Sequence, residues 1–185
     1  GIDTVVTSFT YSIAAATNVD HITLTGGAQA NATGNTANNI LTGNGNDNVL
    51  DGAAGVDTLK GGAGNDVYVI DTASDVIDEE ANTDTGDEVR ASFLLSTTLA
   101  GIENYTYTGF MAWNFTGNGL DNVITGSAGF DTLDGGGGAD TLRGGHGLDV
   151  YLIDSADDVV DELSNGDGWG EVRASFLLAS TFLGI

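Results

Sequence analysis

The chain has 185 residues, including 29 glycines but no proline and no cysteine, and its 27 acidic residues outnumber its four basic ones to give a formal net charge of −23. Such a surface excludes nucleic acid and anionic membranes as partners, because binding them relies on Lys and Arg, and no apolar run is long enough for membrane insertion. The charge instead favours a bound cation, which would also replace the disulfides that a secreted protein without cysteine lacks.

Residues 1–33 begin the chain as a segment of predicted strands. Apolar and polar residues alternate in HITLTG, where Ile22 and Leu24 share one face, and this period of two is typical of half-buried strands. We assign residues 1–33 as the strand segment of a first repeat copy that covers residues 1–86.

Residues 34–86 follow a nine-residue period on the template G-G-x-G-x-D-x-U-x, in which U is a large apolar residue. The four clearest units read GNTANNILT, GNGNDNVLD, GAAGVDTLK and GGAGNDVYV and begin at Gly34, Gly43, Gly52 and Gly61. The period persists beyond the glycines, since Asp75 and Asp84 again fall at position six. So high a glycine content argues against helix and predicts loops joined by very short strands.

Residues 87–116 are the strand segment of a second copy. Apolar residues alternate from Val89 to Leu95, and NYTYTG continues the pattern. We expect these segments to form wider coils of one solenoid, so that a single apolar interior runs through the chain. The alternative is a separate small sandwich, which would bury little apolar surface in so few residues.

Residues 117–169 repeat the nonamer block and complete the second copy, residues 87–169, at an offset of 83 residues from the first. Four units, GNGLDNVIT, GSAGFDTLD, GGGGADTLR and GGHGLDVYL, begin at Gly117, Gly126, Gly135 and Gly144. Residues 170–185 start a third copy. Because terminal repeats of a solenoid normally differ from internal ones, we interpret the chain as part of a longer tandem array. A two-copy domain with a swapped or degenerate end is the alternative.

The nonamers resemble the RTX family, the haemolysin-type calcium-binding repeats with the signature GGxGxDxUx. The resemblance covers roughly half of each copy, and eight units in one register argue against a chance match. It implies an all-β fold, a parallel β-roll or β-solenoid in which two nonamers form one turn and Ca²⁺ binds between glycine-rich loops stacked on the same edge. Coils stacked about 4.8 Å apart would make an elongated rod.

The residues themselves account for such a site. Calcium takes about six to eight oxygen ligands, and because an aspartate supplies one or two, backbone carbonyls must supply the rest. Glycine turns successive carbonyls toward one point without steric cost, and the apolar residue at position eight would fill the interior. The candidate metal residues are the position-six residues Asn39, Asn48, Asp57, Asp66, Asp75, Asp84, Asn122, Asp131, Asp140, Asp149, Asp158 and Asp167, with the loop glycines Gly52, Gly61, Gly126, Gly135 and Gly144.

Loops two nonamers apart would stack, which gives eight candidate sites and up to about eight calcium ions. Five sites pair two aspartates: Asp57 with Asp75, Asp66 with Asp84, Asp131 with Asp149, Asp140 with Asp158, and Asp149 with Asp167. Three sites pair an asparagine with an aspartate: Asn39 with Asp57, Asn48 with Asp66, and Asn122 with Asp140. We expect weaker binding at these three, because one ligand charge is missing. The alternative is an Asx turn that satisfies only its own loop, and it stays open above all for Asp84 and Asp167, which lack the glycines.

The sequence carries no catalytic motif. Its two histidines, His21 and His146, stand outside any zinc-binding pattern, and no G-x-S-x-G motif occurs, so we expect no enzyme activity. Two functions remain: a calcium-binding structural segment of an extracellular bacterial adhesin, matrix, surface layer or fibre, and a calcium-dependent secretion and folding module of a type I secreted enzyme or toxin. The long repeat favours the first, outside the cell or on the bacterial surface. Its partners would be calcium and neighbouring repeats of the chain or end-to-end copies in a fibre.

Overall fold

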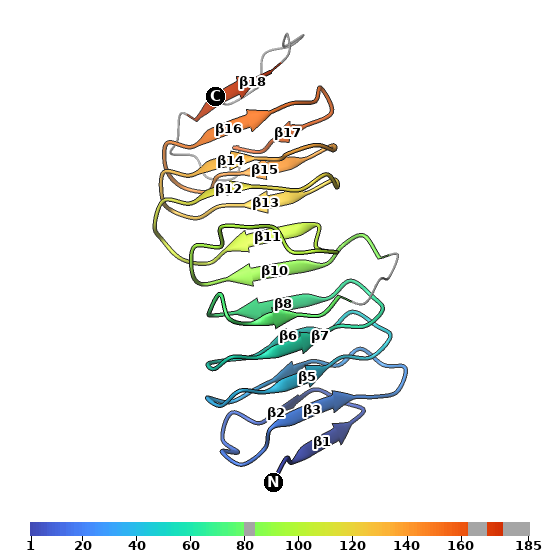
Figure 1. The fold of residues 1–185 in the computed structure, drawn as a ribbon. Coiled ribbons are helices and arrows are strands. Elements are labelled where there is room, and N and C mark those ends of the chain that lie inside the picture. The colour runs from blue at the N-terminus through green and yellow to red at the C-terminus, as the bar shows by residue number, and fades with distance from the viewer. Residues whose placement is uncertain (80–83, 163–169, 176–185) are drawn as a thin grey trace. The chain divides into compact units, whose positions relative to one another are not determined.

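The computed structural model describes residues 1–79, 84–162 and 170–175, and the regular secondary structure in these ranges is all β-strand. The chain divides into two compact units, Gly1–Ser92 with Leu99–Ile102 and Phe93–Thr98 with Glu103–Ile185. Within each unit, short parallel strands wind into successive coils (Figure 1). No helix that could cross a membrane is found in the described ranges. The predicted all-β solenoid with parallel strands is confirmed.

The first unit contains two runs of parallel strands, to which successive strands contribute alternately. One run has the order β1-β3-β5-β7-β9, with β1 (Thr4–Thr7), β3 (His21–Leu24), β5 (Ile40–Thr42), β7 (Thr58–Lys60) and β9 (Val76–Ile77). The other consists of β2 (Tyr11–Ser12), β4 (Ala32–Thr33), β6 (Val49–Asp51), β8 (Val67–Ile70) and β10 (Glu88–Ala91), each paired with the next.

The second unit repeats this plan with two runs of four strands. One is formed by β11 (Asn104–Tyr107), β13 (Val123–Thr125), β15 (Thr141–Arg143) and β17 (Val159–Val160). The other is formed by β12 (Asn114–Thr116), β14 (Thr132–Asp134), β16 (Val150–Ile153) and β18 (Glu171–Ala174). Loops connect the two runs, and within the nonamer blocks the described loops lie next to the loops of the adjacent coil.

The strand register sets the length of one coil. Within the nonamer blocks, paired residues such as Ile40 and Thr58 are 18 positions apart, which is two nonamers and confirms the predicted turn. The pairings of β8 with β10 and of β16 with β18 differ. There Val67 pairs with Glu88, and Val150 with Glu171, so the last coil of each nonamer block is three residues longer.

The apolar residues at position eight form the interior, as predicted. Each is fully buried because alternate side chains of a strand point to opposite faces, and burial of one such side chain stabilises the fold by about 1.5–3 kcal/mol. They are Leu41, Leu50, Leu59 and Tyr68 in the first unit and Ile124, Leu133, Leu142 and Tyr151 in the second. The core of each unit is therefore a ladder of stacked apolar side chains.

The strand segments between the nonamer blocks extend these same runs. In the first unit β3 pairs with β5 and β10 with β8, and in the second unit β11 pairs with β13, always in parallel. They are coils of the solenoid in each unit rather than a separate sandwich. The strand predicted from Val89 to Leu95 is shorter, since β10 ends at Ala91. Leu95 is nevertheless buried, and its carbonyl oxygen accepts a hydrogen bond from the indole N–H of Trp113 (2.7 Å).

Candidate metal centre in the glycine-rich loops

The described position-six aspartates are buried, except for the half-buried Asp75 and Asp84, and they reach backward to the backbone one coil earlier. Asp57 Oδ1 accepts a hydrogen bond from the Asn39 N–H (2.7 Å), and Asp140 Oδ1 accepts one from the Asn122 N–H (2.8 Å). The same 18-residue contact joins Asp66 to Asn48, Asp75 to Asp57, Asp149 to Asp131 and Asp158 to Asp140. Six of the eight predicted loop pairs are thus brought together. Asp167, the predicted partner of Asp149, lies outside the described residues.

The first glycine of each loop leaves the space in which its own carboxylate stands. A Cβ on Gly52 would overlap Asp57 Oδ2, and a Cβ on Gly135 would overlap Asp140 Oδ2. The same overlap would occur at Gly61, Gly126 and Gly144. These five glycines are those predicted from the sequence, and the structure gives them a steric role in seating the carboxylate.

Backbone carbonyl oxygens line the gap between stacked loops. Gly145 has a φ of 92°, and a Cβ there would overlap the Ser127 carbonyl oxygen of the preceding loop. The Gly144 carbonyl oxygen in turn lies close against Gly126, one coil earlier. Carboxylate and carbonyl oxygens therefore gather between adjacent loops, and this is the ligand set that calcium prefers.

Some of these buried carboxylate oxygens have no protein partner. Asp57, Asp66 and Asp140 are at most 1% exposed, and the Oδ2 atom of each accepts no hydrogen bond from the described residues. Burial raises the pKa of Asp57 from 3.8 to about 6 and that of Asp66 to about 7, and nearby carboxylates add to the effect. Burial also raises the pKa of Asp131. One unpaired buried charge destabilises the fold by several kcal/mol, so several of them together would cost about as much as the total stability of a typical domain. These loops therefore fit a bound cation that would neutralise the carboxylates.

The three asparagines at position six face backbone instead. Each begins a stack of nonamer loops, and its side-chain NH₂ group donates to a carbonyl oxygen of the strand segment before it. The contacts are Asn39 Nδ2 to Asp20 O (3.1 Å), Asn48 Nδ2 to Ala30 O (2.6 Å) and Asn122 Nδ2 to Glu103 O (3.0 Å). A carboxylate would place oxygen against oxygen at these positions. The weaker calcium binding expected at the mixed pairs stays a prediction.

The loop register changes at the end of the first block, where the structure corrects the sequence. Asp87, rather than Asp84, accepts the hydrogen bond from the Asp66 N–H (2.7 Å), because this coil is three residues longer. Asp84 Oδ2 instead accepts the Gly64 N–H (2.9 Å). The sequence analysis also missed Glu79, whose carboxylate lies beside those of Asp66 and Asp87.

The four basic residues of the chain form ion pairs on or beside strands. The pairs are Lys60 with Asp78, Arg90 with Glu88, Arg143 with Asp161 and Arg173 with Glu171. All four are partly exposed, and such pairs add about 0–1 kcal/mol each. Their acidic partners are not position-six residues. These ion pairs therefore do not neutralise the position-six carboxylates, which would need another cation.

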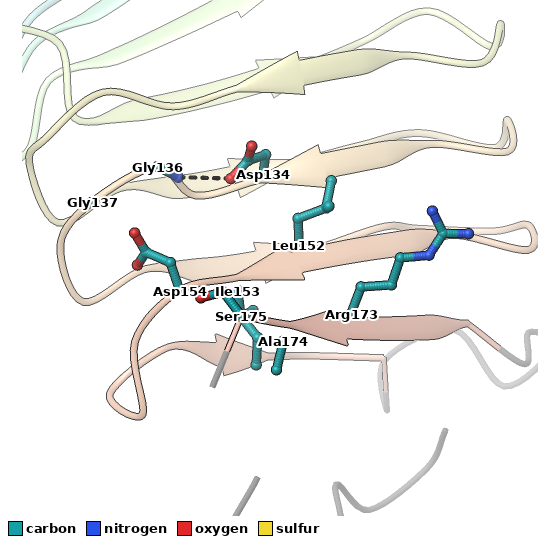
Figure 2. A pocket seen from close by; sticks show the side chains of 9 residues that line it. All are labelled: Asp134, Gly136, Gly137, Leu152, Ile153, Asp154, Arg173, Ala174 and Ser175. Atoms are coloured by element: carbon teal, nitrogen blue, oxygen red, sulfur yellow. Dashed lines mark hydrogen bonds between the residues drawn. The ribbon is translucent and has the colours of Figure 1, made fainter. Parts of the chain in front are cut away.

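A pocket of about 620 Å³ lies beside β14, β16 and β18. Figure 2 shows its lining residues, which are Asp134, Gly136, Gly137, Leu152, Ile153, Asp154, Arg173, Ala174 and Ser175. Asp134 Oδ1 accepts the Gly136 N–H (3.1 Å), and Arg173 Nε donates to Glu171 (3.0 Å). These polar groups serve a turn and an ion pair, and no hydrogen bond joins a nucleophile to a base among the described lining residues.

Comparison with known proteins identifies the loops. A family model for the RTX calcium-binding nonapeptide repeat (4 copies) matches residues 33–68 and 116–151. These two stretches are RTX repeats. They coincide with the stacked loops just described, and RTX repeats are structural calcium-binding repeats rather than catalytic ones. A comparison with curated protein sequences finds no significant match.

The geometry of the RTX loops fits calcium in chemical terms. Carboxylates such as those of Asp57 and Asp140 would provide charge, loop carbonyls would provide the remaining oxygens, and the chain has no cysteine thiolate to favour a softer metal. When bound, calcium would neutralise carboxylates that the protein buries without a basic partner. These residues would hold and orient the ion, which would then take part in the packing of adjacent loops.

We expect the RTX loops to respond to pH in opposite ways with and without calcium. The folded-state pKa values of Asp57 and Asp66 lie above the unfolded value of 3.8, at about 6 and about 7. The calcium-free fold therefore binds more protons than the unfolded chain between about pH 4 and about pH 7, and its stability falls as pH rises through that window. Circular dichroism in chelator should show more β structure near pH 5 than near pH 8.

Protons and calcium compete for the same oxygens, so the calcium dependence has the other sign. The calcium concentration that gives half-maximal folding should increase as the pH is lowered from about 8 to about 5. A calcium midpoint that stays constant across this range would contradict the placement of these carboxylates at the ion.

Proposed function

We propose that this chain is a calcium-stiffened structural segment of an extracellular bacterial adhesin, matrix, surface-layer or fibre protein. The observation that carries the proposal is the set of buried position-six carboxylates, of which Asp57, Asp66 and Asp140 keep one oxygen without a protein partner. A fold that needs ions in its interior uses calcium as a structural component. Millimolar calcium outside cells would supply it, and the low calcium of a cytosol would not.

The repeat organisation supports a structural role. Two RTX blocks recur at an offset of 83 residues, each preceded by a strand segment that joins the same runs of strands. A repeated unit that stacks on its neighbours extends reach without needing a catalytic centre. Calcium and neighbouring repeats of the same chain, or end-to-end copies in a fibre, are the proposed partners.

A second candidate is the calcium-dependent secretion and folding module of a type I secreted enzyme or toxin. The observation that favours it is the formal charge of −23, which would keep the chain extended and easy to thread until calcium binds. A catalytic domain elsewhere in the protein would then carry the activity. The 83-residue repeat is the reason to prefer the structural function.

Shape in solution tests the structural proposal. With about 4.8 Å between adjacent strands, four to five coils would advance one repeat copy by roughly 20 Å. Small-angle X-ray scattering of the chain in calcium should therefore give the profile of a narrow rod, with a cross-section that stays constant along its length. A compact, globular profile in saturating calcium would reject a role in mechanical reach. A chain without its calcium-binding carboxylates is the matched control and should scatter as an expanded coil.

A further inference from the structure

Three carboxylates converge in the first unit, where its nonamers end. Ligand atoms of Asp66, Glu79 and Asp87 all lie within 4.8 Å of one another; Asp66 and Asp87 are fully buried and Glu79 is half-buried. Only Asp66 belongs to an RTX nonamer. Glu79 follows β9, and Asp87 immediately precedes β10. The cluster therefore combines one repeat residue with two residues that the repeat signature does not contain.

Hydrogen bonds to Asp66 and Tyr68 hold the side chains of Asp87 and Glu79 in the cluster. Asp87 Oδ1 accepts the Asp66 N–H (2.7 Å), and the Tyr68 hydroxyl donates to Glu79 Oε1. A Cβ on Gly61 would overlap both Asp66 Oδ2 and the Tyr68 hydroxyl, so glycine at this position allows the two to approach. The Tyr68 hydroxyl and the carboxylate of Asp66 thus lie side by side next to Gly61.

An independent observation points to a ligand in this cluster. Asp66 is 0% exposed, and its Oδ2 atom accepts no hydrogen bond from the described residues. Like charges this close together repel each other strongly, and more so where water is excluded. Three ionised carboxylates at this spacing therefore need a counter-ion or must take up protons. Their hard oxygens, with the Tyr68 hydroxyl oxygen nearby, suit a divalent cation such as calcium.

The second repeat copy provides a natural comparison at the same place. Its equivalent residues are Asp149, Glu162 and Gly170, so the position of Asp87 carries no side chain. The Tyr151 hydroxyl donates to Glu162 Oε1 (2.6 Å), which reproduces the contact between Tyr68 and Glu79. The tyrosine–glutamate contact thus occurs in both copies, whereas the carboxylate of Asp87 occurs only in the first.

We infer that Asp66, Glu79 and Asp87 bind one calcium-class divalent cation that ends the stack of ions in the first copy and has no equivalent in the second. The inference rests on the proposed function, because it assumes that the chain binds calcium at its RTX loops. Two residues outside the nonamers, Glu79 and Asp87, complete the ligand set where the next RTX loop is missing. The two copies consequently differ by one ion.

Calcium stoichiometry of the full chain tests this site. Glu79→Gln and Asp87→Asn each remove one charge and keep an oxygen that accepts the hydrogen bond from Tyr68 or from the Asp66 N–H. Each variant should bind one calcium ion fewer per chain than the unaltered protein in equilibrium dialysis against calcium. Glu162→Gln is the matched control, because it makes the same change beside Gly170, and it should leave the number of ions unchanged. Circular dichroism in saturating calcium confirms that each variant is folded.

The outcomes are distinct. An unchanged number of ions in a folded Glu79→Gln or Asp87→Asn chain would overturn the inference, as would an equal loss in Glu162→Gln. If the cluster holds a proton instead, Glu79→Gln should stabilise the calcium-free chain and leave the ion count unchanged, and the inference would again fail. A chain that binds no calcium at all would refute the proposed function itself, so the two failures are separate.

Discussion

Removal of calcium is expected to unfold this chain almost completely at neutral pH. The chain carries a formal charge of −23, and eight bound divalent ions would reduce it to −7. Without them, buried carboxylates such as those of Asp66 and Asp140 must either stay charged and unpaired or take up protons, and an unpaired buried charge costs several kcal/mol against a typical total stability of about 5–15 kcal/mol. Far-ultraviolet circular dichroism in a calcium chelator should show an unfolded chain, and added calcium should restore the β spectrum.

Magnesium at the same ionic strength separates binding from general screening. Screening weakens repulsion between exposed charges whichever divalent ion is present, whereas the gaps between RTX loops favour the larger ion with its higher coordination number. We expect magnesium to restore little of the β spectrum. A circular dichroism spectrum with full β structure in chelator would contradict the proposal that buried ions stabilise this fold.

Replacement of Gly145 by alanine is expected to destabilise the second unit strongly. Its φ of 92° lies in the left-handed region, and the new Cβ would overlap the Ser127 carbonyl oxygen, a backbone atom that cannot rotate away. Backbone strain and the forced separation of two loops should together cost on the order of 3 kcal/mol or more. Thermal unfolding in saturating calcium should show a markedly lower Tm, and calcium titration a lower affinity.

Gly137→Ala is the matched control for this substitution. Gly137 lies in the adjacent nonamer, and a Cβ there would have no atom within 4 Å. Alanine also reduces the conformational entropy of the unfolded chain, which favours the folded state. The free energy of unfolding should therefore change by no more than about 1 kcal/mol. Equal losses for the two variants would mean that the close approach of the loops at Gly145 is not what limits the fold.

The nonamer register was sufficient to predict most of the site geometry. A period of nine residues, with two nonamers in each coil, places Leu59 and Leu133 in the interior and Asp57 beside the loop of Asn39. These outcomes follow from the sequence because a solenoid has only local neighbours, so one repeat length decides every contact. The same reasoning selected Gly52, Gly61, Gly126, Gly135 and Gly144, but for turning backbone carbonyls toward an ion, and it did not foresee that each leaves space for its own carboxylate.

The sequence reasoning failed where the coil length changed. It extended the nine-residue period to Asp84, whereas the partner of Asp66 is Asp87. A signal was available: Val89 must point inward beside Tyr68, and their separation of 21 residues already contains the extra three. Glu79 carried no such signal, because its approach to Asp66 depends on the side chain of Tyr68 rather than on any period.

The backward reach of each position-six side chain gives the coil a direction of assembly. The space between two stacked loops is closed by a carboxylate from the later loop: Asp57 reaches back to the loop of Asn39, and Asp140 reaches back to the loop of Asn122. The two sides of a gap are only 18 residues apart, so closing it costs little chain entropy. A chain that appears with its N-terminus first can therefore close each gap as soon as the following coil arrives. Growth by one coil at a time keeps contact order low, and it spares the chain a slow search for distant partners.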